Sequence, residues 1–176
     1  MYMTENNTLS SRRLLLRPIV KDDAAAIFAY RGLPEAAKYQ YWGPFSLEQA
    51  ADFVAKNANA SLDIRGRWIG LAVVLKENNT VIGDCALQIE GNAAEIGFSI
   101  APKYQKQGFA KEVALTLADY AFNTANAIQV FAVTDTQNTA CIKLLESIGF
   151  QRDVNFENSL ICKGVLSIEH KYIKHK

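Results

Sequence analysis

The residues best suited to bind a charged ligand lie in the turn between Gln105 and Lys111. From Gly108 onward, apolar residues recur at the spacing of one helix face, at Val113, Ala114, Leu117, Ala118 and Ala121. The start of a helix has several backbone N–H groups without intrahelical partners and the positive end of the helix dipole, so it can bind an anion such as a pyrophosphate. Gly108 has no side chain to obstruct a phosphate, and Lys106 and Lys111 add mobile positive charge. The turn therefore predicts a phosphate-binding site.

A strand with one carboxylate precedes this turn. Between residues 93 and 100, apolar residues alternate with small or polar ones, which is the period-two pattern of a strand with two different faces. The parity places Glu95 on the face opposite Ile96 and Phe98. Pro102 ends the strand, because proline cannot donate to a ladder of hydrogen bonds. One ionisable group thus lies on the strand that leads into the turn.

Three segments of the chain together resemble the GNAT (Gcn5-related) N-acetyltransferases. Gln105-x-x-Gly108-x-Ala110 resembles the family signature Q/R-x-x-G-x-G/A. The strand that contains Glu95 precedes it, and the segment N-T-A-C-x-K-L-L-E-S-I-G-F, which begins at Asn138, resembles the family's N-x-x-S…L-x-x-x-G-F element. The order of the three segments fits the family, and the resemblance spans nearly the whole chain. Within the family, the chain looks most like the branch of the RimJ/RimL-type ribosomal-protein N-terminal acetyltransferases.

The sequence departs from the family patterns at two kinds of position. In the turn, Lys106 replaces the glycine that is frequent after the first polar position, and Ala110 fills the last small position. Neither blocks phosphate binding, because the backbone provides the contacts. In the later element, Cys141 stands where N-x-x-S has serine.

The resemblance implies the GNAT fold, in the α/β (α+β) class: a mixed, mostly antiparallel central sheet with a splayed parallel strand pair and flanking helices. The sequence agrees with this arrangement. The helix that starts at Gly108 separates the Glu95 strand from an apolar strand at 128–133, so these two strands should run parallel through a crossover. We expect a single domain over residues 1–176, with a loose segment at 1–11.

The remaining elements follow from caps and turns. Asp22 or Asp23 is expected to cap a helix at 24–31, and a capping box at 46–49 to start a helix at 47–58. The other expected strands and the short helix lie at residues 13–20, 68–76, 80–89, 140–147, 150–163 and 165–173.

Three further details can be read from the pattern. Pro18 marks the strand at 13–20 as an edge or terminal strand. The near-continuous apolar run at 128–133 predicts a strand that is covered on both faces. Gly149 is expected to stop a helix in a left-handed cap, and the final hairpin to turn at residues 163–164.

The resemblance implies acetyl-CoA as co-substrate. Its pantetheine arm would pair with backbone groups of the Glu95 strand and with Asn138, and its pyrophosphate would lie on the turn. The implied donor-binding residues are Phe98, Ser99, Ile100, Gln105, Lys106, Gln107, Gly108, Phe109, Ala110, Lys111 and Asn138. Lys143 could also reach a phosphate, although it equally fits a solvated helix lysine.

Amine acetylation needs a neutral amine, an oriented thioester and a proton for the departing thiolate. By resemblance, Glu95 is the candidate general base, acting directly or through water, an effect typically worth about 10²–10⁴ in rate. The alternative is an ion pair or a hydrogen bond that stabilises the strand. Cys141, as a thiol of ordinary pKa near 8.5, could protonate the thiolate, or it could be a small packing residue at a helix start.

Aromatic residues crowd around a Gly-Pro turn ahead of the second helix. Family resemblance places this loop over the acceptor cleft, where Tyr39, Tyr41 and Trp42 are candidate acceptor-binding residues. They could equally pack the helix pair onto the sheet. The acceptor is left open between a protein or peptide α-amine and a small amine such as an amino acid, a polyamine or an antibiotic. A non-catalytic acyl-CoA-binding module is the alternative from another class.

Composition limits the remaining possibilities. The chain has 176 residues and a formal net charge of +1, which argues against a nucleic-acid binder. No stretch approaches the ~20 apolar residues that span a bilayer, and no secretory signal is visible. Three sparse cysteines are typical of a protein in the reducing cytoplasm rather than of a disulfide-bonded one. With only two histidines, a His-rich metal site or a His-based triad is not expected. A Rossmann site is not expected, because no G-x-G-x-x-G follows an early strand. The sequence allows a monomer or a homodimer.

Overall fold

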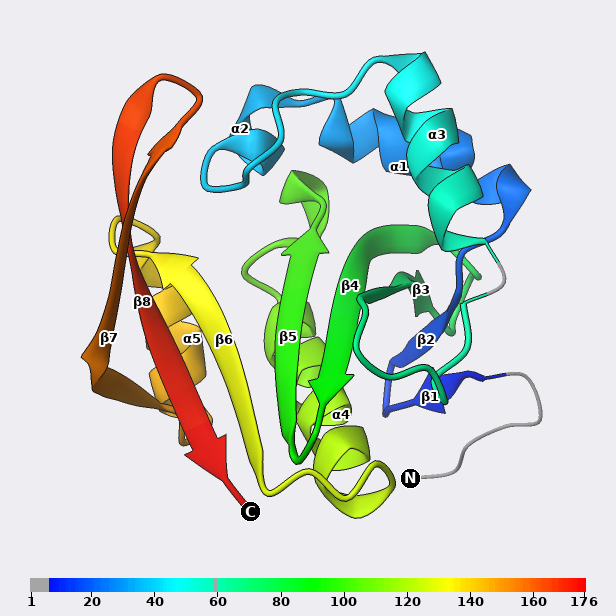
Figure 1. Cartoon of the computed structure of the whole chain (residues 1–176). Helices are drawn as coiled ribbons and strands as arrows, with labels where there is room; N and C mark the ends of the chain where they lie inside the picture. Colours follow the sequence, from blue (N-terminus) through cyan, green and yellow to red (C-terminus); the bar gives the residue numbers. More distant parts are fainter. Residues whose placement is uncertain (1–6, 59) are drawn as a thin grey trace.

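The computed structural model describes residues 7–58 and 60–176, in which one mixed sheet has the strand order β1-β2-β3-β4-β5-β6-β8-β7 (Figure 1). The strands are β1 (Leu9–Ser10), β2 (Leu14–Pro18), β3 (Ile69–Leu75), β4 (Val81–Glu90), β5 (Ala93–Ile100), β6 (Gln129–Asp135), β7 (Gln151–Cys162) and β8 (Val165–His175). The α-helices are α1 (Ala24–Arg31), α2 (Pro34–Ala37), α3 (Leu47–Asn57), α4 (Phe109–Asn123) and α5 (Thr139–Ser147). Two 3₁₀ helices, η1 (Lys21–Asp23) and η2 (Pro102–Tyr104), precede α1 and follow β5.

The N-terminal segment differs from the expectation of a loose tail at 1–11. Residues 1–6 lie outside the described residues, but Leu9 and Ser10 form β1, which pairs with β2. Leu9 is fully buried in the main hydrophobic cluster, and that burial explains the ordered strand. Because β1 lies outside it, β2 is not the edge strand that Pro18 suggested, although the proline does end the strand.

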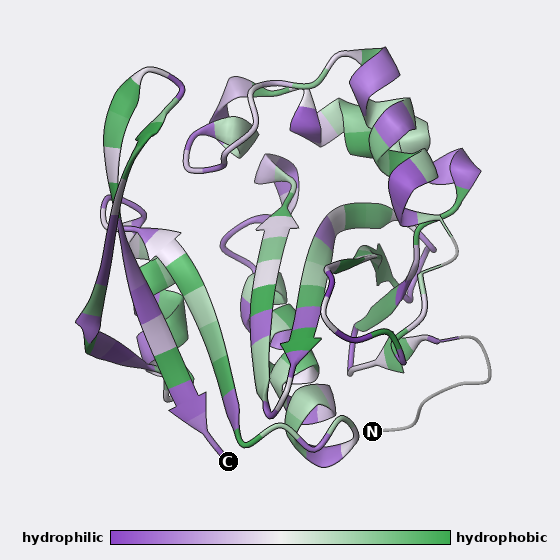
Figure 2. Ribbon diagram, viewed as in Figure 1, coloured by the Kyte–Doolittle hydropathy of each residue, from purple (hydrophilic) through white to green (hydrophobic). Residues whose placement is uncertain are grey.

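Alternation along the strands explains why helices pack on both faces of the sheet. Leu14, Leu16 and Val73 belong to the cluster that includes α4, whereas Leu15 and Val74 contact the cluster that includes α1 and α3. Successive strand residues point to opposite faces, so each strand contributes to both clusters. Figure 2 shows hydrophobic residues along the central strands and more hydrophilic ones along β7.

The predicted parallel pair is confirmed, and it is short. β5 and β6 pair at only three positions, from Ala93 opposite Gln129 to Glu95 opposite Phe131. Beyond Glu95 the two strands separate, as Figure 1 shows. On its other side, β5 pairs with β4 along its whole length, so it is anchored there while its β6 side is open toward Ile100.

The expectation that the strand at 128–133 is covered on both faces is wrong for one face. Val130 and Ala132 are buried in the main cluster, but Phe131 and Val133 are only half-buried. α4 packs against one face of β6. On the other face, the ammonium of Lys171 lies 4.9 Å from the centre of the Phe131 ring, and a lysine covers a strand less completely than a helix does.

Most of the predicted caps and turns are confirmed. The Ser46 hydroxyl accepts from the backbone N–H of Gln49 at 3.2 Å, and the Gln49 side chain accepts from the backbone N–H of Ser46 at 2.8 Å, which is the predicted capping box. Gly149 has a φ of +90°, as expected for a left-handed cap. The β7–β8 hairpin turns through Lys163 and Gly164, whose φ angles are +52° and +81°.

The predicted carboxylate cap of α1 is wrong. Asp23 occupies the N-cap position, but its side chain makes no capping hydrogen bond. Its two oxygens instead accept from the Arg17 guanidinium at 2.7 and 2.8 Å, and one also accepts from the backbone N–H of Val20. A forked, charge-assisted pair is stronger than a bond to one backbone N–H, so the arginine takes the carboxylate.

Gly83 allows β4 to approach β5 near the end of the latter. A Cβ on Gly83 would lie 2.2 Å from the Ser99 carbonyl oxygen, whereas a Cβ on Gly97 would meet nothing within 4 Å. We therefore expect Gly83→Ala to lower the free energy of unfolding by roughly 2 kcal/mol or more, because backbone must move to relieve the contact. Urea denaturation measures this, with Gly97→Ala as the matched control. Equal stabilities of the two variants would contradict the prediction.

Candidate active site

The turn before α4 has the backbone conformation that an anion site requires. Gly108 is the N-cap of α4, with φ +80° and ψ 4°, and Lys106 has φ +61°. The first α-helical bond of α4 runs from the Glu112 N–H to the Gly108 carbonyl at 3.1 Å, so the N–H groups of Phe109 to Lys111 precede the helical ladder. The glycine that many signatures have at the Lys106 position would adopt this left-handed conformation without strain.

A cavity of about 410 Å³ connects this turn to the free end of β5. It is lined by Phe98, Ser99 and Ile100 from β5, by residues of the turn and the first turn of α4, by the start of α5, and by α2 with the loop after it. Ten of the residues expected to bind the donor line it: Phe98, Ser99, Ile100, Gln105, Lys106, Gly108, Phe109, Ala110, Lys111 and Asn138. Cys141 also lines it, whereas Gln107 and Glu95 do not.

The polar side chains of this region hold the turn as well as facing the cavity. The Gln105 amide donates to the Ile100 carbonyl at 2.9 Å, which ties the turn to the end of β5. Asn138 caps α5, since its side-chain oxygen accepts from the backbone N–H of Cys141 at 3.3 Å. Gln107 donates to the Lys103 carbonyl from outside the cavity. Lys143 is exposed on α5 and does not line the cavity either.

Glu95 lies at the last paired position of β5 and β6, just before the strands diverge. It is half-buried, and burial raises the pKa of its carboxyl group. Lys171 opposes this shift in the pKa and Glu169 adds to it. A carboxylate with a raised pKa, three residues before the cavity wall at Phe98, is suited to accept a proton near neutral pH.

A second cavity of about 180 Å³ is lined by Glu169, which acts on the pKa of Glu95, and Tyr39 lines both cavities. Tyr41 lines the smaller one, and its hydroxyl donates to the buried carboxylate of Glu169. Burial, Glu169 and Glu95 together raise the pKa of the Tyr41 phenol, so the three side chains are electrostatically coupled. Trp42 lines neither cavity, because it packs over the Arg31 guanidinium at 4.3 Å.

The tip of the β7–β8 hairpin fixes the loop that carries these aromatic residues. The ammonium of Lys163 donates to the Ala37 carbonyl, and it also reaches the carbonyls of Lys38 and Trp42 at 3.5 Å. The Cys162 thiol donates to the Gln40 carbonyl at 3.6 Å. The loop over the two cavities is therefore held from the opposite end of the sequence.

Comparison with known proteins identifies the architecture. The family profile for the acetyltransferase (GNAT) domain matches residues 13–151. The chain belongs to the GNAT family. It is 34% identical over 150 residues to the uncharacterized N-acetyltransferase p20 of Bacillus licheniformis, a match that covers 83% of each chain. The GNAT assignment explains why the turn, the divergent strands and the cavity occur together.

Two solved structures are also similar to the chain. A GNAT-family acetyltransferase from Bacillus anthracis superposes with a TM-score of 0.83 at 24% identity, covering 96% of this chain and 98% of the other. A Vibrio cholerae protein, assigned as a candidate to the ribosomal-protein-serine acetyltransferases, superposes with a TM-score of 0.78 at 22% identity, covering 99% and 100%. At these identities both comparisons show the GNAT fold.

Membership of the GNAT family makes the protein an acyltransferase of the N-acetyltransferase type, with acetyl-CoA as the co-substrate of the family. Within residues 7–58 and 60–176, no helix is long and apolar enough to cross a membrane. Over the same residues, no group of three or more His, Cys, Asp or Glu side chains is arranged to hold a metal ion.

Several residues around the site carried no signal in the sequence. Tyr104 and Leu144 line the larger cavity, and Glu169 and Lys171 act on the pKa of Glu95. Leu144, Glu169 and Lys171 come from elements whose periodicity predicts a strand or a helix but not its neighbours, and Tyr104 lies in the connector after β5. Only the order of strands, with β8 inserted between β6 and β7, brings Glu169 and Lys171 toward Glu95.

Proposed function

We propose that this GNAT protein transfers the acetyl group of acetyl-CoA to a primary amine by direct attack in a ternary complex. The observation that carries the proposal is the single cavity that runs from the left-handed turn at Gly108 to the open end of β5. One end offers N–H groups and lysine charge to a pyrophosphate, and the other offers an unpaired strand edge to an amide-containing arm. Acetyl-CoA carries both a pyrophosphate and an amide-containing pantetheine arm, so one molecule can occupy both ends of the cavity.

The donor would be held chiefly by backbone. N–H groups at the start of α4 would bind the pyrophosphate, with Lys106 and Lys111 lining the same cavity. Backbone groups of Phe98 to Ile100 would pair with the pantetheine arm, and the side-chain NH₂ of Asn138 is available beside it, since its oxygen already caps α5. Oriented N–H groups on this edge would also polarise the thioester carbonyl.

Glu95 is the proposed general base. The amine nitrogen attacks the thioester carbonyl carbon, a C–N bond forms, and Glu95 accepts the proton that the nitrogen loses, directly or through water. The C–S bond then breaks and CoA leaves as a thiolate, which takes up one proton from solvent, while Glu95 releases to solvent the proton that it accepted. Holding both substrates in register supplies much of the remaining acceleration.

Cys141 is better placed to pack than to protonate that thiolate. Burial raises the pKa of its thiol, against a weaker opposing hydrogen bond from Thr134, so it is a poorer acid than an ordinary thiol such as that of CoA. We therefore expect Cys141→Ala to keep kcat within about threefold of the parent value. Steady-state kinetics measure this, and Cys141→Ser serves as the near-isosteric control. A hundredfold loss of kcat in Cys141→Ala, with Cys141→Ser active, would instead support an acid role.

The acceptor that we propose to test first is the N-terminal α-amine of a protein or peptide, as in the RimJ/RimL-type branch. The candidate assignment of the Vibrio cholerae neighbour motivates this choice. A specific observation favours a small amine as the second candidate. Lys163 fixes the loop that carries Tyr39 and Tyr41. The smaller cavity, which both tyrosines line, has a volume of only about 180 Å³, and this is a small space for an extended peptide. Cytoplasmic location and assembly as a monomer or homodimer remain predictions.

Thiol release from acetyl-CoA across an acceptor panel tests the proposal. The panel would contain ribosomal-protein N-terminal peptides, free amino acids, polyamines and aminoglycosides, and mass spectrometry would identify the acetylated nitrogen. We expect one class to stimulate release well above hydrolysis. Calorimetry that detects no binding of CoA would overturn the proposal, and CoA binding without transfer to any acceptor would favour a non-catalytic acyl-CoA-binding module.

A further inference from the structure

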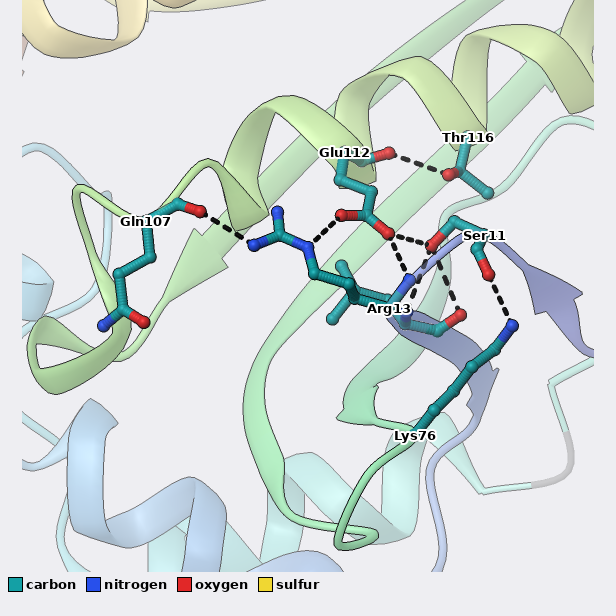
Figure 3. Close-up of polar contacts among 7 residues, drawn as sticks. Ser11, Arg13, Lys76, Gln107, Glu112 and Thr116 are labelled. Atoms are coloured by element: carbon teal, nitrogen blue, oxygen red, sulfur yellow. Dashed lines mark hydrogen bonds and ion pairs between the residues drawn. The ribbon is translucent and has the colours of Figure 1, made fainter.

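Arg13 lies beside the turn that precedes α4, although it is 94 residues away from Gln107 in the sequence. It directly precedes β2, and its guanidinium extends along the outside of the α4 N-terminus between Gln107 and Glu112 (Figure 3). Its Nη1 donates to the Gln107 carbonyl at 3.0 Å, and its Nε donates to a Glu112 carboxylate oxygen at 2.7 Å. Its Cζ also lies 4.3 Å from the centre of the Phe109 ring.

The hydrogen bond from Arg13 to Gln107 helps to hold the backbone conformation of the turn. Arg13 donates to the carbonyl of Gln107, and neither residue lines the cavity. The two flanking residues, Lys106 and Gly108, both have left-handed φ angles. A non-glycine residue in that conformation costs about 1–2 kcal/mol and needs surrounding contacts to hold it. The hydrogen bond from Arg13 is such a contact.

Arg13 also neutralises a charge that would oppose anion binding. Glu112 lies in the first turn of α4, where an uncompensated carboxylate would repel a phosphate. Burial alone would raise the pKa of Glu112, but hydrogen bonds from Ser11, from the Arg13 backbone N–H and from the Arg13 side chain lower it. The carboxylate is therefore ionised at neutral pH and has Arg13 as its ion-pair partner.

One nitrogen of the Arg13 guanidinium, Nη2, takes no part in these hydrogen bonds. Within residues 7–58 and 60–176 its Nη2 has no hydrogen-bond partner, and it lies 3.4 Å from the position of a Cβ on Gly108. We propose that Arg13, together with Glu112, is a positioning pair for the donor's pyrophosphate: it fixes the turn and sets the local charge. This inference rests on the proposed function, because it assigns these residues to the same donor site.

A double-mutant cycle tests the pair. CoA affinity would be measured by calorimetry for the parent, Arg13→Gln, Glu112→Gln and the double variant. Arg13→Gln leaves Glu112 unpaired and frees the turn, so CoA should bind at least about tenfold more weakly. Glu112→Gln removes the negative charge, keeps an acceptor for Arg13 and leaves the Arg13 charge uncompensated, so CoA should bind more tightly than to the parent, by up to about threefold. The double variant should bind CoA more tightly than Arg13→Gln but more weakly than the parent, because the unpaired charge is gone while the turn is still free; this partial recovery is the signature of coupling.

A donor without phosphates separates positioning from general stability. With S-acetyl-pantetheine, the KM of Arg13→Gln should equal that of the parent, because this donor does not reach the turn. Equal losses with acetyl-CoA and S-acetyl-pantetheine would overturn the inference, as would unchanged CoA affinity in Arg13→Gln. If Arg13→Gln does not fold, Glu112→Gln decides, because a tenfold loss of CoA affinity there would contradict the charge argument. A parent protein that binds no CoA would remove the proposed function first, and the inference with it.

Discussion

Replacing Glu95 with glutamine should lower kcat by about 10²–10⁴ on the true acceptor while CoA affinity stays unchanged. The substitution keeps the size and the polar character of the side chain but removes its ability to accept a proton. Glu95 lies outside the cavity wall, at the last pairing of β5 with β6, so the donor should bind as before. Steady-state kinetics and calorimetry with CoA measure the two effects separately.

The pH dependence of kcat adds an independent check. Burial and Glu169 raise the pKa of Glu95, and a base must be unprotonated to act. Activity should therefore fall as the pH decreases through a pKa above the ordinary value for glutamate, and Glu95→Gln should lose this acidic limb. Glu90→Gln, at an exposed carboxylate near the end of β4, is the matched control and should show the parent profile. If Glu95→Gln keeps both the parent rate and the limb, Glu95 is not the base.

Gly108→Glu should weaken CoA binding by at least about 100-fold, the largest effect on affinity that we expect from one substitution. Two causes act together. Gly108 has φ +80°, where a side chain is strained, and the new carboxylate would face the phosphates at the helix start. Calorimetry with CoA measures the loss, and thermal unfolding checks that the variant is folded.

Gly66 offers a matched control for this experiment. It has φ +74° and nothing within 4 Å of an added Cβ, so Gly66→Glu introduces the same charge with similar backbone strain, in a loop that does not line the cavity. We expect Gly66→Glu to lose some stability and keep the CoA affinity of the parent. Equal affinities of the two variants would mean that the turn at Gly108 is not the phosphate site.

The sequence predicts well what depends on neighbours along the chain. The capping box at Ser46, the left-handed cap at Gly149 and the hairpin turn at Lys163 each use a local signal within a few residues. The parallel pairing of β5 with β6 also follows locally, because a helix lies between the two strands. These features placed Glu95 and the turn at Gly108 on the correct elements.

Contacts between distant segments could not be predicted in this way. For Trp42 the sequence left acceptor contact and packing equally open, and the structure places its ring against Arg31, which the Asp84 carboxylate holds in a buried pair. Asp23 looked like a cap, but the fold brings Arg17 within hydrogen-bond distance. Both outcomes depend on how side chains pack in the folded protein, which the local pattern of the sequence does not contain.

The turn between β4 and β5 determines where Glu95 lies, although the turn lines neither cavity. Glu90 pairs with Ala93, so only Gly91 and Asn92 connect the two strands, and the ladder they start sets Glu95 opposite Gln88. Side chains alternate between the faces of a strand, so a shift of one residue in the pairing of β5 with β4 would turn every β5 side chain to the other face. Ala94 or Ile96 would then occupy the position of the proposed general base. Homologues with this chemistry should therefore preserve the length of this loop more strictly than its amino acids.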